Sequence, residues 1–122
     1  MHHSEYVPLH LHSEYSLLDG AVKLDELLET AVSMKMPAVA VTDHGNLFGA
    51  VDFYKKAVKA GIKPIIGSEM YIAPRSRLDK TKTETEGAAF HLILLARDND
   101  GYRNLITLSS KAYIEESVMR LR

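Results

Sequence analysis

The strand–helix–strand pattern between residues 38 and 73 constrains the fold of this chain more than any other feature. "AVAVTDHG" (38–45) is a short apolar run that closes on polar residues, as a strand buried in a parallel sheet does. "NLFGAVDFYKKAVKAG" (46–61) predicts an amphipathic helix, with Gly61 where the end of a helix favours glycine. "IKPIIGSEMYIA" (62–73) predicts the next strand. Strands joined in this way run parallel with a right-handed crossover, so the sequence predicts an α/β fold.

The segment before residue 38 shows the same alternation of strand and helix. "YVPLHLHS" (6–13) alternates apolar and polar residues, which predicts a short strand with His10 and His12 on one face. Residues 22–36 place apolar side chains at helical spacing, and Pro37 ends the predicted helix. The chain therefore begins its sheet one strand before residue 38.

The segment after this unit predicts a hairpin and a final helix. Residues 75–87 contain one apolar side chain and predict a surface loop. "AFHLILLAR" (89–97) predicts a fourth strand, paired across that loop with residues 69–73. "DNDGY" (98–102) predicts a turn, and a helix follows from residue 102 to about residue 119, with one apolar face formed by Leu105, Leu108, Ala112 and Met119.

Residues whose side chains can bind metal ions lie at the ends of three successive predicted strands. His10 and His12 close the first, Asp43 and His44 close the second, and Glu69 lies at the end of the third. Functional sites of parallel α/β folds assemble at the carboxyl ends of the strands. Imidazole and carboxylate groups suit zinc, manganese and iron, and a carboxylate that bridges two ions serves phosphoester hydrolysis. The coincidence predicts a multinuclear metal site.

Each of these residues alone has a simpler interpretation. A single H-x-H on an exposed strand usually has no role, and Glu69 at a strand end is unremarkable. Asp19 before Gly20 fits a helix cap or a turn. Asp43 fits a strand-ending turn bonded to backbone, and His91 fits a half-buried histidine with satisfied hydrogen bonds. Only the combination on three strand ends favours a metal site.

The composition excludes several other classes of function. The 122 residues carry a formal net charge of -1, which gives no general attraction for nucleic acid or membranes. With no cysteine, a disulfide framework and nucleophilic thiol chemistry are excluded, and metal ligands are limited to histidine and carboxylate. No G-x-G-x-x-G, G-x-x-x-x-G-K-[ST] or G-x-S-x-G motif is present. No segment is long and apolar enough to be a signal peptide or a membrane span, so we expect a cytoplasmic protein without membrane contact.

Three stretches of the chain resemble the first motifs of the polymerase and histidinol phosphatase (PHP) superfamily. They are "HLHSEYSLLDG", "TDHGNLFG" and "GSEMYIA". The longer stretches "AVTDHGNLFGAVDFYKKAVKAGIKPIIGSE" and "FHLILLARDNDGYRNLITLSSKAY" are similar to the N-terminal PHP domain of bacterial DNA polymerase III alpha subunits. The resemblance runs through nearly the whole chain.

This resemblance implies the architecture and the ligands of the site. The fold would be a partial, distorted TIM-like (β/α)7 barrel with parallel strands and a β-hairpin insertion. Its strand ends would hold divalent ions, zinc or manganese, up to three in a complete domain. Asp43 would orient His44 or its neighbours. The residues that match metal-ligand positions are His10, His12, Asp19, His44, Glu69 and His91.

The resemblance also implies a function in DNA replication. The PHP site would be a 3′–5′ proofreading exonuclease with a metal-bound water as nucleophile, and nucleotide addition would belong to other domains. Partners would be DNA, through the full polymerase, and other polymerase III holoenzyme subunits. One alternative is a structural platform that docks a separate exonuclease subunit. Another is a stand-alone phosphatase, such as one acting on histidinol phosphate, although "GYRNLITLSSKAY" argues against it.

The resemblance further implies that residues 1–122 are the N-terminal half of a single PHP domain. The later PHP motifs, which supply the remaining ligands, and the polymerase palm, fingers and thumb lie outside this sequence. A half-barrel exposes sheet edges and apolar surface, which favours self-association or poor stability. Because half of the ligand sphere is missing, we expect weak or no turnover of the chain by itself.

Overall fold

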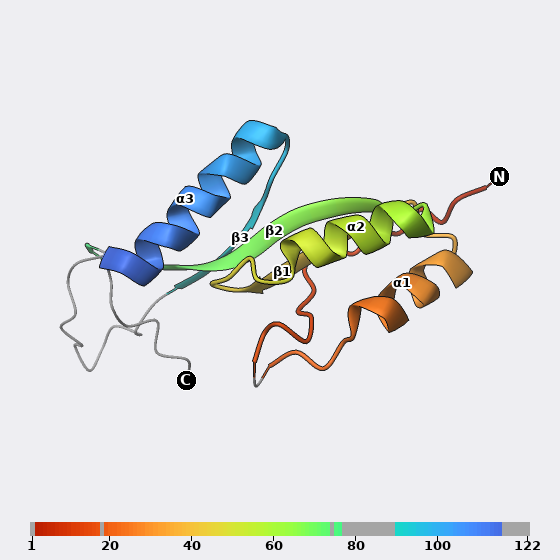
Figure 1. Cartoon of the computed structure of the whole chain (residues 1–122), viewed down its shortest axis with the longest axis horizontal. Coiled ribbons are helices and arrows are strands. Elements are labelled where there is room, and N and C mark those ends of the chain that lie inside the picture. The colour runs from red at the N-terminus through yellow and green to blue at the C-terminus, as the bar shows by residue number, and fades with distance from the viewer. Residues whose placement is uncertain (1, 18, 74, 77–89, 116–122) are drawn as a thin grey trace.

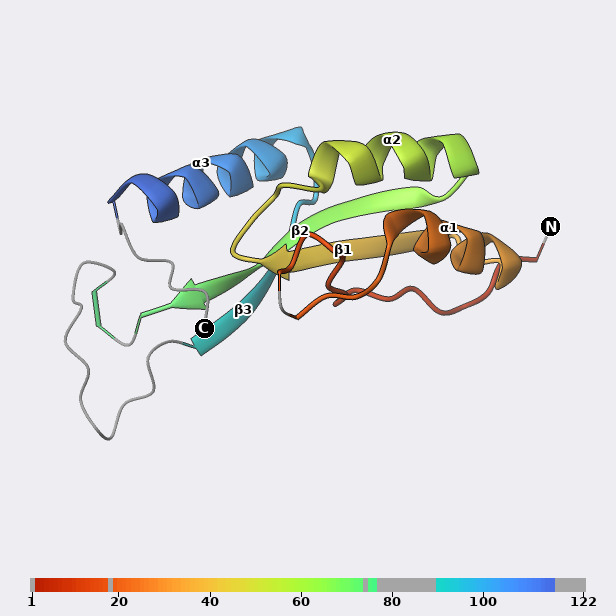
Figure 2. The same cartoon turned by 60° about the horizontal axis from the view of Figure 1, so that its bottom comes forward.

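The computed structural model describes residues 2–17, 19–73, 75–76 and 90–115. Within these residues, three helices lie on one side of a three-stranded sheet (Figures 1 and 2). The elements in chain order are α1 (Leu24–Ser33), β1 (Ala38–His44), α2 (Ala50–Ala60), β2 (Lys63–Ile72), β3 (Phe90–Leu95) and α3 (Asn99–Glu115).

The sheet has the order β1-β2-β3 and contains both strand directions. β1 and β2 are parallel, which confirms the predicted crossover through α2. Their register runs from Ala38 opposite Lys63 to His44 opposite Glu69. β3 pairs antiparallel with β2 and places His91 opposite Tyr71, which confirms the predicted hairpin. Side chains that carry metal-ligand chemistry therefore meet at one end of the sheet.

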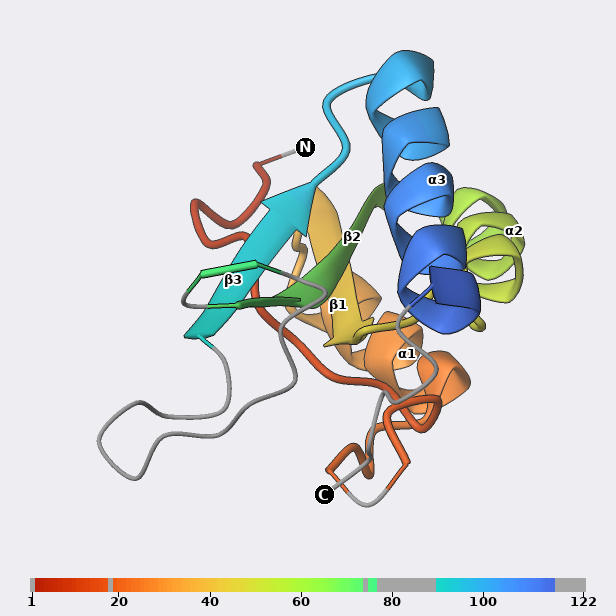
Figure 3. The same ribbon diagram turned by 90° about the vertical axis from the view of Figure 1, so that its left-hand side faces the viewer.

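The core lies between the sheet and the first two helices. Phe53 of α2 is fully buried, and apolar residues of α1 and β1 surround it. The view along the strands shows the helices on the same side of the sheet (Figure 3). This packing holds the strand ends in place from one side. The buried cluster comprises Leu24, Leu28, Ala31, Val39, Val41, Phe53, Ala57 and Ile62.

The expected first strand is an extended segment rather than a regular strand, so that prediction was wrong in detail. The backbone N–H of Ala40 donates to the Pro8 carbonyl at 2.9 Å, and that of Thr42 donates to the Leu11 carbonyl at 2.8 Å. The Leu11 N–H instead bonds the Thr42 hydroxyl at 3.1 Å, and Pro8 has no N–H to give. The segment still runs along β1 as a neighbouring strand would (Figure 2).

The helices α1 and α2 are shorter than their sequence patterns predict. α1 ends at Ser33, because Met36 N–H reaches back to the Ala31 carbonyl at 2.9 Å and Lys35 takes a left-handed φ of 54°. α2 begins at Ala50 rather than residue 46, since the residues before it form a turn. Its end matches the prediction, with Gly61 at φ 78°.

α3 begins earlier than predicted, at Asn99, so "DNDGY" is its first turn rather than a separate turn. Asp98 explains the start, because its carboxylate accepts the Gly101 N–H at 2.9 Å as an N-cap does. The predicted apolar face is also wrong in part: Leu105 is buried, but Leu108 is 47% exposed. Met119 and most of the predicted loop at 75–87 lie outside the described residues.

Candidate metal centre

Glu69 is the centre of a cluster of histidines at the end of the sheet. It lies on β2, and only 5% of the residue is exposed. Its Oε2 lies 2.5 Å from His12 Nε2, 3.3 Å from His10 Nε2 and 3.4 Å from His44 Nδ1. Its Oε1 lies 2.9 Å from His91 Nδ1. One carboxylate thus joins imidazoles from the N-terminal segment, β1 and β3.

Asp19 supplies a second carboxylate next to the same cluster. Its Oδ2 lies 3.4 Å from His12 Nδ1 and also contacts His44 Nε2. Asp19 does not cap the following helix, because α1 begins at Leu24 with Lys23 as its N-cap residue. His12 and His44 therefore lie between the two carboxylates, each turning one ring nitrogen to either side.

The donor atoms of these side chains are close enough together to share ions. In each of three groups, one donor atom from every residue lies within 4.8 Å of the others. Imidazole nitrogen and carboxylate oxygen are the donors that zinc and manganese use in proteins. His12, Glu69 and His44 each belong to two groups. The Glu69 carboxylate can bridge neighbouring ions, whereas each neutral imidazole can bind one ion. The groups are His10–His12–Glu69, His12–Asp19–His44 and His44–Glu69–His91.

The electrostatics of the cluster keep Glu69 ionised. Burial alone would raise the pKa of its carboxyl group, but hydrogen bonds from His91, His12 and His10 and the charge of His44 outweigh burial. The pKa of Glu69 is lowered from 4.5 to about 2. Glu69 is thus a carboxylate at neutral pH despite its burial, as a metal ligand must be.

Asp43 does not point into the cluster but holds the loop that leads from His12 to Asp19. Its Oδ1 accepts the Ser13 N–H at 2.6 Å and the Ser16 hydroxyl at 2.7 Å, and its Oδ2 accepts the Ser13 hydroxyl at 2.7 Å. The Ser16 oxygen in turn accepts the His44 N–H at 3.0 Å. Asp43 thus reaches the His44 backbone through Ser16, and its orienting role stays a prediction.

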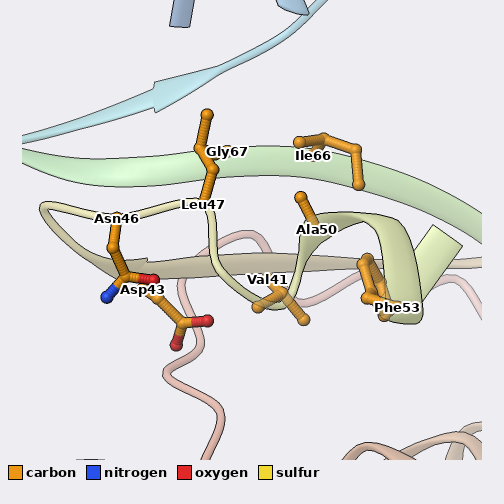
Figure 4. A pocket seen from close by; sticks show the side chains of 8 residues that line it. All are labelled: Val41, Asp43, Asn46, Leu47, Ala50, Phe53, Ile66 and Gly67. Carbon is orange, nitrogen blue, oxygen red and sulfur yellow. The ribbon is translucent and has the colours of Figure 1, made fainter. Parts of the chain in front are cut away.

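A small pocket lies beside Asp43 on the helix side of the sheet (Figure 4). The Asp43 carboxylate is turned toward the N-terminal segment, where its serine partners lie. Apolar side chains of β1, β2 and α2 make up most of the lining, so the pocket belongs to the core and not to the cluster. Its lining residues are Val41, Asp43, Asn46, Leu47, Ala50, Phe53, Ile66 and Gly67.

The structure brings all six predicted ligand residues together, and it adds three residues that the sequence analysis missed. Ser13 and Ser16 are the partners of Asp43, and their place directly after the H-x-H pair was the available indication. Tyr71 lies with its hydroxyl 3.2 Å from His44 Nδ1. Its position two residues after Glu69 was the indication, because alternate residues of a strand share a face.

The sheet has its helices on one side and the histidine–carboxylate cluster at its end, which defines an α/β protein with a candidate metal site. The PHP domain family matches residues 8–121 of the chain. The chain therefore belongs to the PHP domain family.

Relatives of known identity match nearly the whole chain. It is 56% identical over 110 residues to DNA polymerase III subunit alpha of Chlamydia muridarum, covering 90% of this chain and 9% of that protein. It is 50% identical over 119 residues to the same subunit of Borreliella burgdorferi, covering 98% of this chain and 10% of that protein. The chain thus spans about a tenth of the length of these relatives.

Two solved structures share the fold at low sequence identity. A proposed metal-dependent phosphoesterase from Bifidobacterium adolescentis superposes with a TM-score of 0.59 at 16% identity, over 92% of this chain and 35% of that chain. An amidohydrolase from Chromobacterium violaceum superposes with a TM-score of 0.56 at 21% identity, over 89% of this chain and 34% of that chain. The predicted fold class, a partial TIM-like PHP barrel, is confirmed.

Among the described helices, none has the length and apolar character needed to cross a membrane.

Proposed function

We propose that this chain contributes the first ligands of a multinuclear metal centre that hydrolyses phosphodiesters at the 3′ end of DNA. One observation carries the proposal: Glu69 contacts four histidines, and two of them also contact Asp19. We assign the ligand roles to His10, His12, Asp19, His44, Glu69 and His91, and the ions to zinc or manganese, up to three in a complete domain.

The chemistry of such a centre suits phosphoester hydrolysis. Paired divalent ions, when bound, supply a water of lowered pKa and neutralise charge on the attacking and leaving oxygens of the phosphate. The structural relative from Bifidobacterium adolescentis carries the description of a proposed metal-dependent phosphoesterase, which agrees with this reaction class. The chain's own part is to hold two carboxylates and four imidazoles at one end of a rigid sheet.

The exposure of the cluster indicates where substrate approaches. The side chains of Glu69 and His44 are 6% and 15% exposed, whereas those of His10, His91 and Asp19 are 54%, 50% and 60% exposed. A phosphodiester therefore meets the cluster from the side of His10, His91 and Asp19. Glu69 stays underneath, where its charge holds the histidines in place.

The relatives support a proposal for the function of the whole protein. We propose that the protein containing this chain is a replicative DNA polymerase subunit of the cytoplasm, with DNA and other polymerase III holoenzyme subunits as partners. The relatives' shared name, DNA polymerase III subunit alpha, supports this. Nucleotide addition would belong to regions of the protein beyond this sequence.

A 3′-end nuclease assay tests the proposed reaction on the protein in the length that the cell makes. Single-stranded DNA labelled at its 5′ end should shorten from the 3′ end in the presence of Mn²⁺ or Zn²⁺. His12→Ala and Glu69→Ala should each abolish the shortening, since both remove ligands shared between groups. His3→Ala, at an exposed residue outside the cluster, is the control and should leave it intact. If the His12→Ala and Glu69→Ala proteins shorten the DNA as much as the unaltered protein does, this site is excluded as the source of the nuclease activity.

A second candidate function is a structural platform that docks a separate exonuclease subunit. Exposed apolar side chains on α3 and the loop before α2 favour it, with Phe48 63% exposed and Ile114 79% exposed. The same variants distinguish the two functions, because a structural platform should still bind the exonuclease subunit when His12 is replaced. Co-sedimentation of the His12→Ala protein with the exonuclease subunit, together with loss of DNA shortening, would show both roles.

A further inference from the structure

Tyr71 lies at the exposed edge of the cluster without being one of the expected ligands. It follows Glu69 by two positions on β2, so both side chains stand on the same face of the sheet. Its hydroxyl oxygen lies 3.2 Å from His44 Nδ1. The Tyr71 and His44 rings are nearly parallel, at 16° and a centroid separation of 6.1 Å. Tyr71 thus faces His44 from the side opposite to Asp19.

Tyr71 also contacts a histidine of the neighbouring strand. It is paired directly with His91 across the β2–β3 ladder. The two rings meet edge to face, with centroids 4.9 Å apart at 87°. Cross-strand pairs of this kind restrict the rotamers of both side chains. The Tyr71 ring therefore contacts both His91 and His44, whose own ring centroids lie 5.7 Å apart, and limits the motion of each.

The orientation of the His44 ring has to be restricted because either of its two nitrogens could bind a metal ion. Nε2 contacts Asp19, and Nδ1 lies 3.4 Å from Glu69 Oε2. A neutral imidazole offers one lone pair, so one nitrogen must serve as the metal donor while the other carries a proton. The hydrogen bond that the second nitrogen makes decides which one donates.

We infer that Tyr71 is a positioning residue that engages Nδ1 of His44 and so holds the ring with Nε2 turned toward the Asp19 side of the cluster. In the metal-free chain, the Tyr71 hydroxyl donates to Nδ1, and the Nε2–H of His44 donates to Asp19. When an ion takes the Nε2 lone pair, Nδ1 carries the proton and donates to the Tyr71 oxygen. The hydroxyl serves both states because it can donate or accept.

This inference rests on the proposed metal role of His44, but its first test does not need metal. Long-range proton–nitrogen NMR of the chain in chelator, at a pH where the imidazole is neutral, reports which nitrogen carries the proton. We expect the Nε2–H tautomer for His44 in the unaltered chain, with signals assigned by their loss in His44→Gln. In Tyr71→Phe, Nδ1 loses its hydroxyl partner while Glu69 stays near it, so the fraction of the Nδ1–H tautomer should rise even though Asp19 still accepts from Nε2–H.

The second test is the affinity for Zn²⁺, measured by competition with a chromophoric chelator. Loss of a group that orients a metal-bound histidine costs 10–100-fold in affinity, so Tyr71→Phe should weaken zinc binding by at least about tenfold. Tyr54→Phe removes the hydroxyl of an exposed tyrosine on α2 and is the matched control, with both properties unchanged.

The two measurements separate this inference from the proposed function. An Nδ1–H tautomer in the unaltered metal-free chain, or the same tautomer fractions in Tyr71→Phe as in the unaltered chain, overturns the role of Tyr71 whatever the metal data show. If the chain binds no zinc, the proposed metal centre fails, and the tautomer measurement alone decides the role of Tyr71. Zinc affinities of Tyr71→Phe and Tyr54→Phe within twofold of each other also overturn it.

Discussion

At the residue scale, the cluster depends on a buried carboxylate that remains charged. Glu69 is 5% exposed, and burial by itself favours the protonated acid. Contacts with His91, His12 and His10 reverse that preference and lower its pKa to about 2. The folded state therefore binds the proton of Glu69 less readily than the unfolded state does, and stability must depend on pH.

The sign of this dependence follows from the lowered pKa. The contribution of Glu69 is fully present above its unfolded pKa of 4.5 and is lost as pH falls through its folded pKa of about 2, in total about 3 kcal/mol. Glu69→Gln has no such proton to bind. Urea unfolding in chelator should show the stability difference between the unaltered chain and Glu69→Gln shrinking by roughly that amount from pH 5 to pH 2. A difference that stays constant over this range would contradict the account.

A second residue-scale feature is the buried hydrogen-bond set around Asp43. Ser16 is 2% exposed, and its hydroxyl links the Asp43 carboxylate to the His44 backbone. Ser16→Ala leaves a buried carboxylate oxygen with one partner fewer, which costs about 1–3 kcal/mol. Ser33→Ala is the control, because the Ser33 hydroxyl bonds a carbonyl at the exposed end of α1. Chemical denaturation of both variants checks this, and equal losses would show that the Ser16 bonds add nothing.

At the element scale, the register of β2 against its neighbours places the ligands. Gly67 lies two residues before Glu69, and a Cβ there would come within 2.6 Å of the Leu94 carbonyl and 2.9 Å of Thr42 Cγ2. β1, β2 and β3 approach this closely only because residue 67 has no side chain. The glycine of "GSE" is therefore part of what brings the ends of the strands together.

Replacing Gly67 should disturb the sheet and the cluster together. Gly67→Ala forces a methyl group against backbone atoms of β3, and overpacking of this kind costs about 1–3 kcal/mol. Gly101→Ala is the control, since its Cβ has no neighbour nearer than 3.4 Å and alanine favours the helix α3. Thermal unfolding should show a lower Tm for Gly67→Ala and an unchanged or higher Tm for Gly101→Ala. The reverse order would contradict the close approach of the strands.

Apart from the first expected strand, the order and type of the elements were predictable from the sequence, but their ends and the contacts of the site were not. The apolar run before Asp43 and the glycine after α2 are local features, so β1 and the end of α2 were predicted correctly. The end of α1 and the start of α3 depend on capping contacts such as that of Asp98, which periodicity does not report. Tyr71 joins the cluster through pairing with β3, and pairing is a property of the folded sheet.

At the scale of the whole molecule, the described residues form part of a barrel and leave apolar side chains exposed to solvent. β3 is an edge strand in the described sheet, and Phe90 and Leu92 on it are 64% and 43% exposed. Open edges and apolar surface favour association with another chain. Sedimentation velocity should therefore show the purified chain moving toward larger species as its concentration rises. A single monomeric species at every concentration would contradict this expectation.

The central claim, that the cluster binds divalent ions, is tested most directly by the metal content of the purified chain. The unaltered chain is equilibrated with Zn²⁺, freed of unbound ions by gel filtration and analysed by plasma mass spectrometry, beside His12→Ala, Glu69→Gln and the control His2→Ala. We predict at least about one ion per chain in the unaltered protein and in His2→Ala, since ligands shared between groups remain intact. His12→Ala and Glu69→Gln should retain much less. No retained zinc, or equal zinc in all four proteins, would contradict the account.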